Sequence, residues 1–134
     1  MSHTCKLAVA LVAWLCAAAA AAADLYVVVH PDLTLQPSEV RDVFLGEKQF
    51  SGTMRLRPVD NAAAQDAFLA KIMRMPASVY STSWTKKAFR EGLTPPPLQS
   101  TDSDVIEFVK RNEGAVGYVT TAPLNVKVLQ KLPN

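Results

Sequence analysis

Five consecutive apolar residues, Leu25–Val29 (L-Y-V-V-V), constrain the fold of this chain more than any other feature. Since successive side chains of a β-strand point to opposite faces, a strand with no strongly polar position is buried on both of them. Such burial requires helices on each side of the sheet. The chain is therefore predicted to be an α/β protein, a three-layer sandwich with a mostly parallel sheet around this strand.

Helix and strand signals alternate along the rest of the chain. Pro37 fits the first position of a helix and Gly46 the residue after its end, while Pro58 indicates that the end of the second strand lies at a sheet edge or has left the ladder. An antiparallel strand is expected to close the sheet. The predicted helices are 37–45, 61–73, 77–91 and 102–111, and the predicted later strands are 54–59, 98–100, 115–119 and 126–129.

The N-terminus has the three parts of a secretory signal. Lys6 supplies the positive charge, residues 7–16 the apolar core, and residues 17–23 a run of alanines ending in an A-x-A cleavage site. We expect a cleavable signal peptide at 1–23 and a single domain at 24–134, located in the periplasm and not inserted in the membrane. An uncleaved anchor and lipidation at Cys16 remain alternatives. The weak apolarity of the alanine run disfavours the first, and the bulky residue before Cys16 disfavours the second.

Removal of the signal leaves few residues for catalysis or metal binding. Both cysteines, Cys5 and Cys16, are lost, and His30 is the one histidine of residues 24–134. No nucleophile–base pair, G-x-S-x-G motif or metal-ligand spacing accompanies it, so we expect no enzyme, metal or cofactor. The remaining 13 Lys and Arg against 12 Asp and Glu give a net charge of +1, which predicts no nucleic-acid binding.

Several short motifs follow one another in an order that resembles phosphate-type periplasmic solute-binding proteins. They are Leu35-Gln36-Pro37-Ser38-Glu39-Val40-Arg41-Asp42-Val43-Phe44-Leu45-Gly46, Phe50-Ser51-Gly52, Tyr80-x-x-x-Trp84, Phe89-x-x-Gly92 and Glu113-Gly114-Ala115-Val116-Gly117-Tyr118-Val119. The resemblance covers nearly all of residues 24–134. It implies the fold of one lobe of a type 2 periplasmic binding protein, whereas full-size members close two lobes on their solute.

The same resemblance points to Asp60-Asn61-Ala62-Ala63-Ala64 as the candidate ligand site. In the family, a motif of the form Arg-x-Asp-Gly-Ser-Gly-Thr binds phosphate with hydroxyls, backbone N–H groups at a helix N-terminus and an Arg charge. Aligned on Asp60, this chain has Ala62 and Ala64 where the hydroxyls should be. Pro58 stands at the Arg position. Free N–H groups are expected to remain, with Asp60 competing for them as a carboxylate cap.

Two functions follow from these expectations. The first is an exported solute-binding-like protein that resembles the substrate-binding component of a phosphate ABC transporter, with a degenerate anion site. Its partners would be a small oxyanion such as phosphate and a transporter permease. The alternative is a periplasmic module that binds another periplasmic protein and has lost its ligand. In both, Tyr80 and Trp84 are expected in the core, and Gly114 and Gly117 are expected to serve packing.

Overall fold

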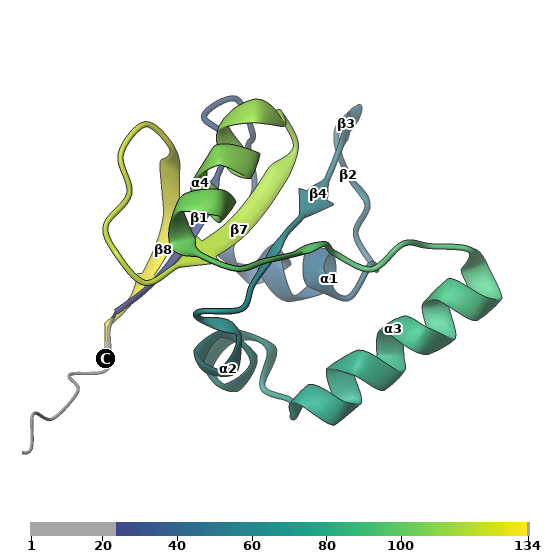
Figure 1. The fold of residues 1–134 in the computed structure, drawn as a ribbon. Helices are drawn as coiled ribbons and strands as arrows, with labels where there is room; N and C mark the ends of the chain where they lie inside the picture. Colours follow the sequence, from purple (N-terminus) through teal and green to yellow (C-terminus); the bar gives the residue numbers. More distant parts are fainter. Residues whose placement is uncertain (1–23, 134) are drawn as a thin grey trace, which may run out of the picture.

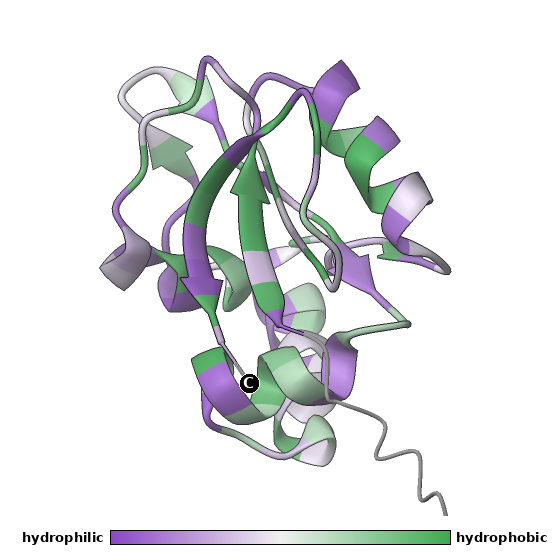
Figure 2. Ribbon diagram, turned by 90° about the vertical axis from the view of Figure 1, so that its left-hand side faces the viewer, coloured by the Kyte–Doolittle hydropathy of each residue, from purple (hydrophilic) through white to green (hydrophobic). Residues whose placement is uncertain are grey.

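The computed structural model describes residues 24–133, so the predicted signal at 1–23 lies outside the described residues. A four-stranded sheet forms the centre of the domain, in the order β4-β7-β1-β8 (Figure 1). Its strands are β1 (Leu25–Val29), β4 (Arg57–Pro58), β7 (Ala115–Val119) and β8 (Lys127–Leu132). Figure 2 shows that β1 is largely hydrophobic, whereas β8, at the edge of the sheet, mixes hydrophilic and hydrophobic residues.

Helices cover both faces of this sheet, as the three-layer prediction requires. On one face, α4 (Asp102–Arg111) packs Val105 and Val109 against Val28, Val59 and Val119. On the other lie α1 (Val40–Phe44), which follows the 3₁₀ turn η1 (Pro37–Glu39), and α2 (Gln65–Phe68), which continues into the π-helical turn η2 (Leu69–Met73). The predicted three-layer α/β architecture is therefore confirmed.

Strand direction follows the prediction in part. β4 runs parallel to β7, and β5 (Asp60–Asn61) runs parallel to β6 (Leu98–Gln99). β8 is the expected antiparallel closing strand. β1 is antiparallel to β7 as well as to β8, so the four-stranded sheet is mixed, with parallel and antiparallel neighbours on either side of the fully buried β7. A continuous apolar run reports burial on both faces, and burial does not determine direction.

The single strand predicted for residues 54–59 is divided in the structure. β3 (Met54–Arg55) forms a hairpin with β2 (Phe50–Ser51), β4 joins the main sheet, and β5 leaves it to pair with β6. Pro58 explains the division, because it has no N–H for a second neighbour and is restricted to an edge. The predicted edge position of Pro58 is confirmed, since β4 is the outermost strand.

Gly114 and Gly117 lie where no side chain fits. A Cβ on Gly114 would come within 1.8 Å of the Arg55 carbonyl oxygen, and one on Gly117 within 2.7 Å of the Val105 side chain. The first glycine lets the turn before β7 meet the strand β3, and the second lets α4 approach the sheet. The packing role predicted for both is confirmed.

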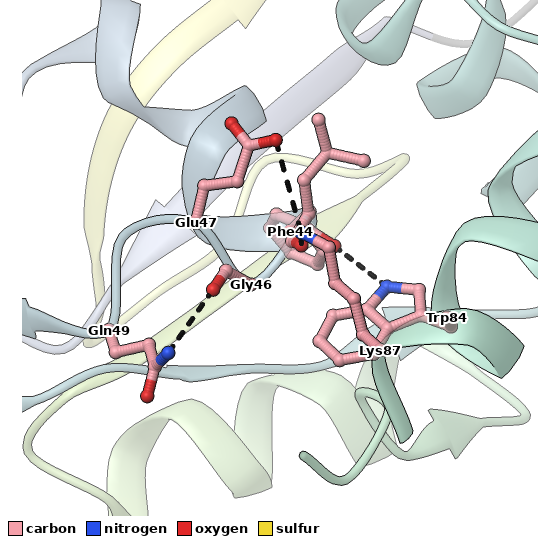
Figure 3. Close-up of polar contacts among 7 residues, drawn as sticks. Phe44, Gly46, Glu47, Gln49, Trp84 and Lys87 are labelled. Atoms are coloured by element: carbon pink, nitrogen blue, oxygen red, sulfur yellow. Dashed lines mark hydrogen bonds and ion pairs between the residues drawn. The ribbon is translucent and has the colours of Figure 1, made fainter. Parts of the chain in front are cut away.

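α3 (Ala77–Glu91) extends from the body of the domain and is fixed to the end of α1 (Figures 1 and 3). The Trp84 Nε1–H donates to the Phe44 carbonyl oxygen at 2.9 Å, and Lys87 donates to the Leu45 carbonyl oxygen. Both acceptors are carbonyls at a helix C-terminus, which lack intrahelical donors. Gly46 has φ +73°, and a Cβ there would come within 2.7 Å of the indole ring. Trp84 therefore connects α3 to α1.

We predict that Trp84→Ala lowers the free energy of unfolding by about 3–5 kcal/mol, because the indole is 6% exposed and its removal leaves a cavity. Phe89→Ala on the same helix is the matched control, since Phe89 is 91% exposed. It should change stability by less than about 0.5 kcal/mol. Urea unfolding of the two variants measures both values. Equal stability of the two variants would show that Trp84 does not fix α3.

Candidate functional site

The predicted site residues lie in β5 and in the turn that joins it to α2. Asp60 and Asn61 are buried at 3% and 0% exposure, and Ala64 is also buried. Ala62 and Ala63 are exposed. The turn therefore presents two methyl groups to solvent where an anion site needs donors.

The backbone N–H groups of this turn are engaged within the protein. Ala62 donates to the Gln99 carbonyl oxygen at 2.8 Å and Ala64 to the Asn61 carbonyl oxygen at 3.0 Å. Ala63 donates to the side-chain Oδ1 of Asn61 at 3.0 Å. The expectation of free N–H groups is wrong for these three residues. Groups without an intrahelical acceptor occur in the first turn of α2, and that turn carries the Asp66 carboxylate.

Asp60 does not cap the helix, contrary to the prediction. Its Oδ2 accepts from the Tyr80 hydroxyl at 2.8 Å and its Oδ1 from the Tyr118 hydroxyl at 2.7 Å. Asn61 does not cap the helix either: its Oδ1 accepts from the Ala63 N–H in the turn ahead of α2, whose N-cap residue Ala64 provides no side-chain cap. Within residues 24–133, no Lys, Arg or His forms an ion pair with Asp60.

The surroundings of Asp60 oppose its charge. Burial raises the pKa of Asp60, and the hydrogen bonds from Tyr118 and Tyr80 offset only part of that effect. Burial, together with the nearby Asp60 charge, also raises the pKa of both tyrosines. The hydroxyls therefore keep their protons and remain donors to the carboxylate.

An aromatic cluster holds Tyr118 in place. Its ring stacks on Phe68 with centroids 3.8 Å apart and an angle of 3° between the planes. Phe44 meets Phe68 edge-on at 4.7 Å. These three rings link β7, α2 and α1 beneath the turn, which fixes the direction of the Tyr118 hydroxyl.

A second carboxylate supports the turn from the other side. Asn61 Nδ2 donates to Asp102 Oδ1 at 2.8 Å and to the Tyr118 carbonyl oxygen at 2.9 Å. Asp102 Oδ2 accepts from the N–H and the hydroxyl of Thr120 at 3.0 and 2.7 Å. Burial opposes the charge of Asp102, but hydrogen bonds from Thr120, Asn61 and Thr121 outweigh it and lower the pKa.

A cleft of about 720 Å³ opens beside Asp60, between α3, α2 and the segment 95–98. Asp60 lies on its wall together with the rings of Tyr80, Trp84 and Phe89. The remaining lining is mostly apolar or small: Gln65, Leu69, Ala77, Ser81, Thr85, Ala88, Pro95, Pro96 and Leu98. This volume falls in the range of small-molecule sites.

Sequence reasoning missed both the partners of Asp60 and this cleft. Tyr118 lies 58 residues from Asp60 in the chain, and only the pairing of the strands brings it near. Tyr80 and Trp84 were predicted as core residues, which their burial confirms. Their second role, on the cleft wall, follows from the way that α3 leaves the body of the domain.

No model of a protein family and no curated protein sequence matches this chain. Solved structures do. A protein of Clostridium perfringens, described as a phosphate ABC transporter substrate-binding protein with bound phosphate, matches with a TM-score of 0.58 at 18% identity. The match covers 81% of this chain and 45% of that one.

Two further structures give the same result. An ABC-type phosphate transport receptor of Vibrio cholerae has a TM-score of 0.51 at 17% identity and covers 82% of this chain and 47% of its own. PstS of Borrelia burgdorferi has a TM-score of 0.51 at 12% identity, and the match covers 72% of this chain and 41% of PstS. The fold of this chain is therefore similar to part of each of these proteins, and the matches cover less than half of each of their chains.

The two carboxylates predict opposite pH dependence for two variants. Because the pKa of Asp60 is raised on folding, the folded state binds this proton at a higher pH than the unfolded chain. The contribution of Asp60 to stability therefore falls as pH rises above the unfolded value of about 3.9. Asp102, whose pKa is lowered, contributes stability that is present above that value and is lost as pH falls through its folded pKa.

We expect Asp60→Asn to destabilise the protein more at pH 3 than at pH 7, and Asp102→Asn to do the reverse. Urea unfolding of both variants and of the unmodified protein at the two pH values measures this. Parallel pH trends for the two variants would contradict the assignment.

Proposed function

We propose that this chain is an exported solute-binding-like protein, related in structure to phosphate ABC transporter substrate-binding proteins, whose anion site no longer holds phosphate tightly. Export through residues 1–23 gives Asp24 as the first residue of the mature chain, which an intact-mass measurement checks. The proposal is supported by the lobe-like fold and by the apolar core of the N-terminal segment. Under this proposal the protein is non-enzymatic and is located in the periplasm.

One observation carries the proposal of a degenerate site: the turn Asp60–Ala64 has no hydroxyl, and the N–H groups of Ala62, Ala63 and Ala64 already have acceptors. Arg57, the nearest cation to the missing Arg position in sequence, is exposed on β4 and forms no ion pair within the described residues. The Asp60 carboxylate adds a negative charge next to the place where an oxyanion would sit.

Isothermal titration with phosphate at neutral pH tests this proposal, and we expect no binding tighter than about millimolar. Each missing hydrogen bond to a charged oxygen costs roughly 1.5–3 kcal/mol, so two cost about 3–6 kcal/mol, or two to four decades of affinity. Ala62→Ser combined with Ala64→Thr should improve binding. Since Ala64 is buried, Ala62→Ser is also measured alone. Micromolar binding by the unmodified protein would contradict the proposal.

A second function, a module that binds a permease or another periplasmic protein, is favoured by a different observation. Phe89 and Leu98 are 91% and 58% exposed, and both lie at the same cleft. Exposed apolar side chains that gather at one place are typical of protein contacts. A protein of this second kind would show no saturable binding of a small solute at the cleft.

A further inference from the structure

The Asp60 carboxylate lies on the wall of the cleft and has no cationic partner among residues 24–133. A buried carboxylate is normally paired with a cation or neutralised, because an isolated charge is costly away from water. Here two neutral hydroxyls are its partners, so the charge itself is not balanced within the described residues.

The carboxylate also has unused acceptor capacity. Two carboxylate oxygens offer about four lone-pair directions, and the hydroxyls of Tyr80 and Tyr118 occupy two of them. A primary ammonium group has three donors and a positive charge. It therefore supplies both the positive charge and the further hydrogen-bond donors that Asp60 lacks.

The rest of the cleft suits an apolar body attached to such a group. Tyr80, which contacts Asp60, and Trp84 line the cleft with aromatic rings, and Leu69, Pro96 and Leu98 add apolar surface. Aromatic faces attract cations, and the effect is larger away from water. The same lining has no Lys, Arg or His, so it offers no charge to an anionic ligand.

We propose that this cleft binds a small organic molecule with a primary amine on an apolar body, with the ammonium group at Asp60. The inference rests on the proposed solute-binding function and names the class of solute. Asp60 is only 3% exposed, so the approach to its carboxylate admits a small head group. A primary ammonium fits this approach better than a trimethylammonium group, whose methyl groups also cannot donate hydrogen bonds.

The test uses three probes of similar shape and different charge: 2-phenylethylamine, 2-phenylethanol and phenylacetate. Each is titrated into the exported protein at pH 7.5 and followed by the NMR shifts of the backbone and of the Trp84 indole N–H. We expect the amine to bind at least tenfold more tightly than the alcohol, with phenylacetate weaker than both. Equal binding of the amine and the alcohol, or shifts confined to residues away from the cleft, would overturn the inference.

Two variants locate the effect. Asp60→Asn should remove the preference for the amine over the alcohol, whereas Asp104→Asn, on α4 and outside the cleft lining, should keep it. Thr85→Trp places a large ring in the cleft from an exposed position of α3 and should weaken the amine at least tenfold. This variant leaves Asp60 intact, so the test holds even if Asp60→Asn does not fold. Retained preference in Asp60→Asn, or unchanged binding in Thr85→Trp, would contradict the site.

Failure of this inference can be distinguished from failure of the proposed function. Tight phosphate binding would overturn the proposal that the anion site is degenerate. It would not contradict the binding of an amine in the cleft. Absence of amine preference, with phosphate also weak, would overturn this inference alone.

Discussion

The Asp60 carboxylate lies between the hydroxyls of Tyr80 and Tyr118 and thereby joins three segments that are far apart in the chain: β5, α3 and β7. A carboxylate at 3% exposure is tolerated only with donors on its oxygens, so both tyrosines must stay in place. Stacking on Phe68 fixes Tyr118, and the attachment of Trp84 to the end of α1 fixes the helix that carries Tyr80. These contacts fix the position of α3, which forms one wall of the cleft.

The motifs that resemble phosphate-binding proteins have structural roles in this chain. Gly46 leaves room for the Trp84 ring, and Gly114 and Gly117 allow the backbone and α4 to approach the sheet. None of these roles requires a ligand. The described scaffold therefore forms with alanine at positions 62 and 64, without the hydroxyls of the phosphate motif. The likeness to the three solved structures agrees with this, because it lies in the fold at 12–18% identity.

Much of the fold could be predicted because its signals are local. The apolar run at Leu25–Val29 determined burial on both faces, and the restrictions of Pro58 and Gly46 located a sheet edge and a helix end. Strand direction and the partners of Asp60 could not be predicted, because they depend on residues distant in sequence. Asp60 and Asn61 were both candidates for the cap of the next helix, and neither side chain caps α2, because each is engaged by other groups: Asp60 by the two tyrosines and Asn61 by the Ala63 N–H.

The central claim is that Asp60 is a buried carboxylate held by two neutral hydroxyls and not by a cation. A ¹³C NMR titration of the aspartate side-chain carboxyls, in the unmodified protein and in Tyr80→Phe, tests it directly. Asp60 is expected to titrate above its ordinary pKa, and above Asp102, which is expected below that value. Loss of the Tyr80 hydroxyl should raise the pKa of Asp60 further, because a hydrogen bond that lowers it is gone. A pKa of Asp60 at or below the ordinary value, unaffected by Tyr80→Phe, would contradict the account.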